Sequence, residues 1–192
     1  MNSVDEALLK YSKKYLLLNV PGIGNSGAMH WQSNWELTFP NIKRLSQKNW
    51  DSPDKDDWVA ELGRLIKQNT DKPIVLITHS LGGGVAIHAN ELDKLQNVKG
   101  VFMVALPDIE RDDFPKDCTG FVPMPKKALT IPGVMISSET DDWCSINVAE
   151  KWAEILKVPF INIGDKQHIC GASEFETWEE GKRLLVEFLD SL

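Results

Sequence analysis

The sequence lacks the features that mark several large classes of protein. Its longest apolar runs are far too short to cross a bilayer. Acidic residues outnumber basic ones by 28 to 21 and the net charge is −7, so the chain has no excess of cations for binding nucleic acids or anionic membranes. There are only three cysteines, Cys118, Cys144 and Cys170, and their spacing predicts neither a disulfide framework nor a zinc site. We therefore expect no nucleic-acid partner, no membrane partner and no metal.

Targeting and repeat signals are also scarce. The chain starts with Met1-Asn2-Ser3-Val4-Asp5-Glu6, which is polar and acidic where a secretory signal would be basic and then apolar. Together with the odd number of cysteines, this start favours a reducing, cytoplasmic location. The 192 residues show no internal repeat and are 42% hydrophobic, which suits a single globular domain over residues 1–192.

What the sequence does contain is an apolar run that ends at a serine. Residues 73–84 read PIVLITHSLGGG, as expected for a buried strand, a tight turn at Ser80 and a closely packed helix. The pattern is typical of a nucleophile elbow, in which the Leu81 N–H lies beside the serine and stabilises an oxyanion. Thr78 replaces the first glycine of G-x-S-x-G and crowds the turn. A simple helix-capping role for Ser80 is the alternative.

Short apolar runs alternate with segments of helical period along the rest of the chain. This alternation predicts parallel βαβ units and an α/β fold, with an open, mostly parallel sheet of six strands covered by helices on both faces. The predicted strands are Tyr15–Val20, Asn41–Ser46, Ile74–Thr78, Gly100–Leu106, Val134–Ser138 and Pro159–Ile163.

Two helices carry clear signals. A helix over Asp54–Asn69 has Ser52 and Pro53 as its expected cap and first residue. The last helix is preceded by a capping-box pattern over Ser173–Glu176, and its apolar stripe comprises Trp178, Gly181, Leu185 and Phe188. By contrast, the proline-rich segment from Pro107 to Pro132 predicts a long irregular insertion, and insertions of this kind often act as lids.

Ligands bind at the carboxyl ends of strands in open parallel sheets, so the loops that follow strands are the places to search. Ser80 follows the third predicted strand, Asp141 and Asp142 follow the fifth, and His168 follows the sixth. Serine, acid and histidine occur in this order in α/β-hydrolases. His168 would accept the serine proton and return it to the leaving group, while a carboxylate at Asp141 would orient the imidazole. A helix-dipole role for these acids is the alternative, and it suits Asp142 at least as well.

The remaining parts of a hydrolase site can also be placed. The second oxyanion donor should be the backbone N–H of Ile23 or Gly24, in the glycine-rich loop after the first strand. Trp31, Trp35 and Trp143 would flank the site, although aromatic residues at the spacing of Trp31 and Trp35 more often belong to a core.

A different chemistry is also conceivable. Gly22, Gly24 and Gly27 satisfy G-x-G-x-x-G directly after a strand, which suggests a dinucleotide site with Asp51 on the ribose. That interpretation leaves Ser80, Asp141 and His168 unexplained. A third hypothesis is a hydrolase-like fold that binds a partner without catalysis, and the replacement at Thr78 is its best support.

Taken together, these residues resemble a known family, the small serine hydrolases similar to bacterial YdeN and human retinoblastoma-binding protein nine. The resemblance covers most of the chain and rests on the segments Pro21–Gln32 with Trp35, Asn49–Trp50, Asp57–Val59, His79–Gly82 and Ser138–Cys144, and on His168. In the family, the acid is usually followed by proline and an aromatic residue. Asp141-Asp142-Trp143 fits this pattern if Asp142 occupies the proline position, which selects Asp141.

The resemblance implies a compact α/β-hydrolase fold and cofactor-free hydrolysis of an ester or related acyl compound. It implies Ser80, Asp141 and His168 as the catalytic residues, with the Leu81 and Ile23 N–H groups as the oxyanion hole. Substrate contacts are expected from Gly24, His30, Trp31 and Trp143. The L-x-C-x-E pattern linked to retinoblastoma protein is not found around any cysteine, so that partner is not expected.

Overall fold

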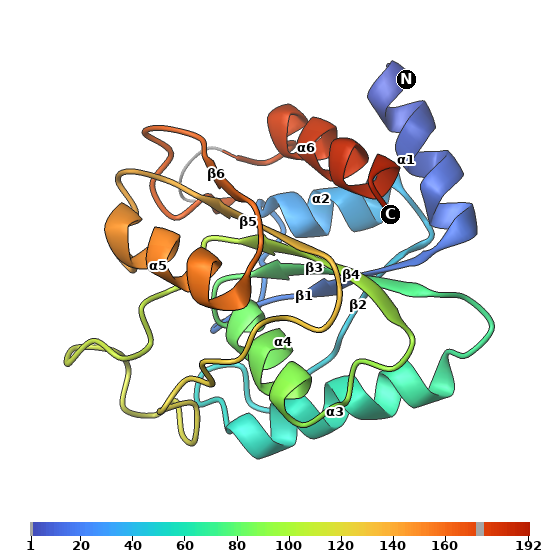
Figure 1. Ribbon diagram of the computed structural model, residues 1–192. Coiled ribbons are helices and arrows are strands. Elements are labelled where there is room, and N and C mark those ends of the chain that lie inside the picture. The colour runs from blue at the N-terminus through green and yellow to red at the C-terminus, as the bar shows by residue number, and fades with distance from the viewer. Residues whose placement is uncertain (1, 172–174) are drawn as a thin grey trace.

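The computed structural model describes residues 2–171 and 175–192 and contains one six-stranded, parallel sheet (Figure 1). The strand order is β2-β1-β3-β4-β5-β6, so the chain reverses its direction of travel across the sheet between β1 and β3. Loops at such a switch point diverge and leave room for a ligand. The strands are β1 (Leu16–Val20), β2 (Ile42–Arg44), β3 (Ile74–His79), β4 (Val98–Val104), β5 (Gly133–Ser137) and β6 (Phe160–Asn162).

Helices cover both faces of the sheet because successive residues of the central strands point to opposite sides. In β3, Ile74 and Leu76 belong to one apolar cluster, whereas Val75 and Ile77 belong to the other. The first cluster packs under α3 (Lys55–Gln68), α4 (Leu81–Glu91) and α5 (Ile146–Leu156). The second packs under α1 (Ser3–Lys14), α2 (Trp31–Thr38) and α6 (Glu179–Asp190), as Figure 1 shows.

The predicted fold class is confirmed. All six predicted strands form, with ends that differ from the prediction by at most two residues. Helix α5, which follows Asp141 and Asp142, begins at Ile146, and neither acid lies in its first turn. Helix-dipole stabilisation therefore does not explain these two acids. None of the helices in residues 2–171 and 175–192 is long and apolar enough to cross a membrane.

The predicted starts of two helices were wrong. The cap of α3 is Asp54, which accepts a hydrogen bond from the Asp57 N–H at 3.1 Å, and not Ser52. The reason is a tertiary contact, because Thr119 accepts from the Lys55 N–H at 3.0 Å and keeps Pro53 outside the helix by donating its own N–H to the Pro53 carbonyl at 2.9 Å.

The last helix begins at Glu179, after Trp178 in a left-handed conformation, so the pattern over Ser173–Glu176 does not cap it. Ser173 and Glu174 themselves lie outside the described residues. The predicted stripe is correct, since Trp178, Gly181, Leu185 and Phe188 are all buried. The N-terminal helix α1 was not singled out from the sequence, and its capping box is formed by Asn2 and Asp5.

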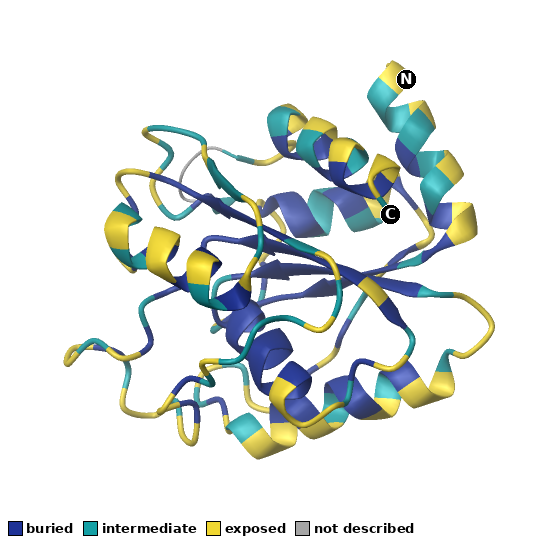
Figure 2. Cartoon of the chain, in the orientation of Figure 1, coloured by how far each residue is buried: buried dark blue, intermediate teal, exposed yellow. Residues whose placement is uncertain are grey.

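The insertion over residues 107–132 contains no helix and no strand. It is nevertheless held by apolar side chains that enter the core, namely Ile109, Phe114, Phe121 and Met124. The insertion covers α4, which explains why that helix is buried along almost its whole length in Figure 2, whereas α3 exposes one side.

Candidate active site

Ser80 occupies a strained turn between β3 and α4. Its φ of 53° and ψ of −130° lie in a region that non-glycine residues rarely adopt, at a cost of about 1–3 kcal/mol. The side chain makes no capping hydrogen bond to α4, so the capping alternative does not account for this serine. The turn is kept in place by the strand on its other side, because the Ser80 N–H donates to the Val104 carbonyl at 3.0 Å.

Two glycines allow the loop after β1 to approach this turn closely. A Cβ atom on Gly22 would lie 2.8 Å from the Ser80 Cβ and 2.9 Å from the Leu81 nitrogen. A Cβ atom on Gly82 would lie 2.0 Å from the Val20 carbonyl oxygen, which no rearrangement of a side chain could relieve. Gly22 and Gly82 are therefore required by contact distances, and Gly22 brings its loop against the serine.

Thr78 does not prevent the turn from forming. It lies within β3, fully buried, with Val20 and Met103 as its partners on the neighbouring strands. Its hydroxyl is buried without a hydrogen-bond partner, which is a cost that the more usual glycine would not carry.

Asp141 and His168 meet at the same edge of the sheet. The His168 Nδ1 lies 2.9 Å from each carboxylate oxygen of Asp141. The Asp141 side chain is only 2% exposed and also accepts from the Trp143 N–H at 2.8 Å. Because a carboxylate only accepts, Nδ1 carries the proton and donates it, which leaves the imidazole Nε2 as a base. Among the described residues, no hydrogen bond joins the Ser80 hydroxyl to the His168 imidazole, and such contacts commonly tighten when substrate binds.

His79 holds the backbone of the histidine loop. Its Nε2 donates to the His168 carbonyl at 2.9 Å, and its ring packs edge-on against the His168 ring with centroids 4.9 Å apart. Burial is the main reason that the pKa of His79 is lowered well below 6.5, with the neighbouring His30 adding to the effect. A neutral His79 can donate from one ring nitrogen only, so this contact defines its tautomer. No role for His79 was expected from the sequence, where its position next to Ser80 is the signal that points to it.

A cavity of about 390 Å³ lies at the amino end of β5, but the cavity that contains Ser80 and His168 is a different one. The latter has a volume of about 310 Å³. Its walls are mostly apolar and come from the β1 loop, the insertion and the loop after β5. The lining residues are Ile23, Asn25, His30, His79, Ser80, Phe114, Pro115, Trp143, His168 and Cys170. Phe114 and Pro115, both from the insertion, were not predicted as site residues.

The two oxyanion candidates in the β1 loop are distinguished by their hydrogen bonds. The Gly24 N–H donates to the Trp50 carbonyl at 2.9 Å, so it is already used. The N–H groups of Ile23 and Leu81 donate to no other described residue. Gly22 packs against the Leu81 nitrogen, and the next residue along the chain is Ile23. Of the two expected donors, only Ile23 therefore has its N–H available beside Leu81.

Not every predicted substrate contact lines the cavity. His30 and Trp143 do, but Gly24 is not among the lining residues. The expectation for Trp31 was wrong, because its ring is fully buried against Trp35 and Trp178, and its indole N–H donates to the Ile169 carbonyl at 2.8 Å. Its helical spacing from Trp35 reflects core packing. Trp35 is fully buried for the same reason.

The glycine loop does not have the geometry of a dinucleotide site. The helix that follows it begins at Trp31, four positions beyond Gly27, so no helix N-terminus adjoins the glycines. Gly22 is used for contact with Ser80 instead. Within the described ranges, no cluster of three His, Cys, Asp or Glu side chains is arranged to hold a metal ion.

A parallel sheet with a strained serine between strand and helix, and an Asp–His pair at the same edge, defines the α/β-hydrolase class. The comparisons agree. The chain matches the family model described as "Serine hydrolase" over residues 17–187, which is most of its length. The protein belongs to the serine hydrolase family.

Solved structures give the same assignment of fold. A YdeN-like hydrolase from Pectobacterium atrosepticum is 28% identical with a TM-score of 0.87, and the match covers 98% of both chains. The ydeN gene product of B. subtilis is 15% identical with a TM-score of 0.69, covering 92% of this chain and 99% of that one. A thermophilic esterase from Thermogutta terrifontis is 16% identical with a TM-score of 0.66, and the match covers 92% of this chain and 90% of that one. No curated protein sequence matched.

Proposed function

We propose that the protein is a cofactor-free, carboxylesterase-like serine hydrolase with Ser80 as nucleophile, His168 as general base and acid, and Asp141 as the residue that orients His168. The backbone N–H groups of Leu81 and Ile23 form the oxyanion hole in this proposal. The observation that carries it is the Asp141–His168 pair at 2.9 Å, since His168 lines one small cavity together with a serine in a strained turn.

The reaction follows from the positions of these groups. The Ser80 Oγ attacks the substrate carbonyl carbon while its proton passes to the His168 Nε2, and the carbonyl oxygen becomes an oxyanion. His168 then gives this proton to the departing alcohol oxygen, which leaves an ester between Ser80 and the acyl group. A water molecule attacks this ester, again giving a proton to His168, and the serine recovers the proton as the acid product leaves. Asp141 stabilises the imidazolium at both stages.

The cavity supports an uncharged acyl group as the substrate class. Its described lining includes no lysine, arginine, aspartate or glutamate, and Ile23, Phe114 and Trp143 supply apolar surface. A carboxylate or phosphate on the acyl group would find no opposite charge there and would lose its hydration. A volume of about 310 Å³ suits a short aliphatic chain or a single ring.

The test is covalent labelling by a fluorophosphonate probe together with hydrolysis of p-nitrophenyl acetate and butyrate. The wild-type protein should be labelled and should hydrolyse both esters. Ser80→Ala should lose labelling and lose activity by at least about 10⁴-fold, because the remaining groups offer no nucleophile. Ser52→Ala, a serine in the loop before α3, is the matched control and should behave as wild type. Full activity in purified Ser80→Ala would overturn the proposal.

The non-catalytic binding hypothesis predicts another outcome in the same experiment. A binding protein of this fold would show neither labelling nor ester hydrolysis, even though it is correctly folded by circular dichroism. Binding of a nicotinamide dinucleotide, measured by calorimetry, would favour the dinucleotide hypothesis, which the close packing of Gly22 on Ser80 argues against.

A further inference from the structure

The loop over residues 21–30, which we term the oxyanion loop, bends through the left-handed region of backbone conformation. Gly24 has a φ of 72° and the next residue, Asn25, has a φ of 64°. A side chain in the left-handed region costs free energy unless the surrounding structure compensates. This loop carries Ile23, whose N–H must be held beside the Leu81 N–H if both are to bind one oxyanion. Contacts from outside the loop that favour this bend would therefore also hold the Ile23 N–H in place.

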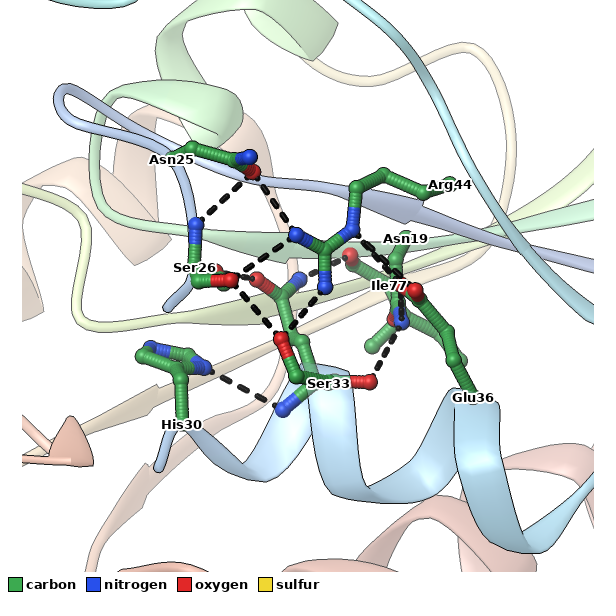
Figure 3. A network of polar contacts seen from close by, with 9 residues as sticks. Asn19, Asn25, Ser26, His30, Ser33, Glu36, Arg44 and Ile77 are labelled. Carbon is green, nitrogen blue, oxygen red and sulfur yellow. Dashed lines mark hydrogen bonds and ion pairs between the residues drawn. The ribbon is translucent and has the colours of Figure 1, made fainter. Parts of the chain in front are cut away.

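Arg44, at the end of β2, contacts the strained part of the loop directly (Figure 3). Its Nη1 donates to the Asn25 Oδ1 and to the Ser26 carbonyl, both at 2.8 Å. The same Asn25 oxygen accepts from the Ser26 N–H at 2.8 Å. The other terminal nitrogen, Nη2, donates to the Ser33 Oγ at 2.6 Å, and that hydroxyl donates to the Ser26 carbonyl at 2.7 Å. One guanidinium thus satisfies the acceptors that the left-handed bend presents.

The guanidinium is itself oriented by an acid. Its Nε lies 2.9 Å and 3.1 Å from the two carboxylate oxygens of Glu36, in α2. Asn19 in β1 donates to the same carboxylate at 2.7 Å. The side chains of Arg44 and Glu36 are only 20% and 22% exposed, so water competes weakly for these contacts. A lysine could not reproduce the arrangement, because its three N–H donors all belong to one nitrogen, whereas these acceptors are reached from three separate nitrogens of the planar guanidinium.

A second set of contacts connects the oxyanion loop to the strand that carries the serine. The Ser26 hydroxyl donates to the Gln32 Oε1 at 2.6 Å, and the Gln32 Nε2 donates to the Ile77 carbonyl at 3.0 Å. Ile77 lies in β3, three residues before Ser80. Gln32 is fully buried, so these bonds are not replaced by water. The loop is consequently fixed relative to the nucleophile from both sides.

We infer that the Arg44–Glu36 pair is a positioning element for the oxyanion hole, which holds the Ile23 N–H where the transition state needs it. Arg44 does not line the cavity and touches no reacting atom, so it acts only through the oxyanion loop. This inference rests on the proposed function. It predicts an effect on turnover that is separate from substrate binding, because the oxyanion exists only in the transition state.

The experiment compares Arg44→Lys, Arg44→Ala and Arg64→Ala in ester hydrolysis. Arg64 also forms an ion pair with a nearby glutamate, Glu61, but on the exposed side of α3, so it is the matched control. We expect kcat to fall about 10-fold in Arg44→Lys and about 100-fold in Arg44→Ala, with KM changing by less than about threefold. Arg64→Ala should retain wild-type constants. Unfolding midpoints of all variants are measured in parallel, and Arg44→Lys remains informative if Arg44→Ala fails to fold.

A second readout separates positioning from a general loosening of the protein. An alkyl trifluoromethyl ketone forms an oxyanion with the serine, whereas the corresponding secondary alcohol does not. Arg44→Lys should weaken binding of the ketone by the same factor by which kcat/KM falls. Binding of the alcohol should stay unchanged. Equal loss for both inhibitors, or wild-type kcat in both Arg44 variants, would overturn the inference. In that case, inactivity of Ser80→Ala would still support the proposed function, whereas an active Ser80→Ala would refute it independently.

Discussion

The two segments that enclose the cavity are held by different kinds of force. The oxyanion loop is held by short polar contacts from Arg44 and Gln32, which fix individual atoms. The insertion over residues 107–132 is held chiefly by large apolar side chains such as Phe114 and Phe121, which fix a surface. Hydrogen bonds are directional and apolar packing is not. This difference fits the proposed function, in which the first segment positions an oxyanion donor and the second shapes the substrate site.

Polar contacts also occur in the insertion, and one of them joins it to Trp143 in the cavity wall. Near the start of the insertion, the Asp108 N–H donates to the Trp143 carbonyl at 2.9 Å. Near its other end, the Thr130 N–H donates to the side-chain oxygen of Asn90 in α4. His88, also in α4, donates to the Phe121 carbonyl at 2.9 Å. Between these points, Arg111 donates to the Asp142 carbonyl, so the insertion also contacts the loop that carries Asp141. A lid function for this insertion remains a prediction of the sequence.

The largest effect should come from the tightest contact of the oxyanion loop. Gly22→Ala adds a Cβ atom 2.8 Å from the Ser80 Cβ and 2.9 Å from the Leu81 nitrogen, so the loop must move away from the serine. We expect kcat for p-nitrophenyl acetate to fall about 10³-fold, as for loss of an oxyanion donor. Gly27→Ala is the matched control, since a Cβ there meets nothing within 4 Å, and it should keep at least half of wild-type activity. Equal activities in the two variants would contradict the contrast between the segments.

Acid should lower the stability of the protein through its buried histidines, of which His30 lies in the oxyanion loop and His88 contacts the insertion. Burial lowers the pKa of His30, at the end of the oxyanion loop, from the ordinary 6.5 to about 3. Between these two values the unfolded chain binds a proton that the folded protein does not, so the free energy of unfolding decreases as the pH falls below 6.5. The expected slope from His30 is about 1.4 kcal/mol per pH unit, with a further contribution from the buried His79.

Urea unfolding of wild type and His30→Asn between pH 7 and pH 5 measures this dependence. Asparagine keeps an acceptor for the Gln32 N–H, which the His30 Nδ1 now accepts at 3.1 Å, but it does not titrate. The variant should therefore lose less stability than wild type over the same pH range. If the free energy of unfolding fell equally with pH in both proteins, His30 would not be the group responsible for the loss of stability in acid.

Phe114→Ala tests the insertion as the segment that shapes the substrate site. Phe114 is 8% exposed, lines the cavity and contacts Trp143 with ring centroids 6.1 Å apart. Its removal should lower the free energy of unfolding by about 2 kcal/mol, less than for a fully buried phenylalanine. KM should change with acyl chain length, while kcat for acetate stays near wild type. Val122→Ala, at a 58% exposed position of the same insertion, is the control. A fall in kcat without a change in chain-length preference would contradict this assignment.

The smallest effect is expected at an exposed polar contact of the insertion. The Thr119 hydroxyl donates to the Asp54 carboxylate at 2.9 Å, at the start of α3, and neither residue lines the cavity. Thr119→Val removes this bond, and we expect a loss of about 0.5 kcal/mol in unfolding free energy with unchanged kcat and KM. A loss above about 2 kcal/mol would show that the insertion depends on polar anchors as much as the oxyanion loop does.

The sequence allowed the sheet, most helices and the candidate residues Ser80, Asp141 and His168 to be placed, because each depends on local pattern or on order along the chain. Other site features could not be found in this way. The choice between Ile23 and Gly24 depends on the Trp50 carbonyl, which accepts the Gly24 N–H. Trp31 was assigned to the site because helical spacing does not distinguish a residue facing a cavity from one facing the core. A cytoplasmic location and a single domain remain predictions of the sequence.

By itself, then, the sequence determined which segments form strands and helices and which chemistry follows each strand, since hydrophobic period and glycine placement act over a few residues. Tertiary structure alone decided how the segments restrain one another. Arg44 reaches Asn25 across 19 positions, and Thr119 sets the start of α3 from 65 positions away. Contacts of this kind arise only when distant backbones are packed together, and no local pattern encodes the distance between them.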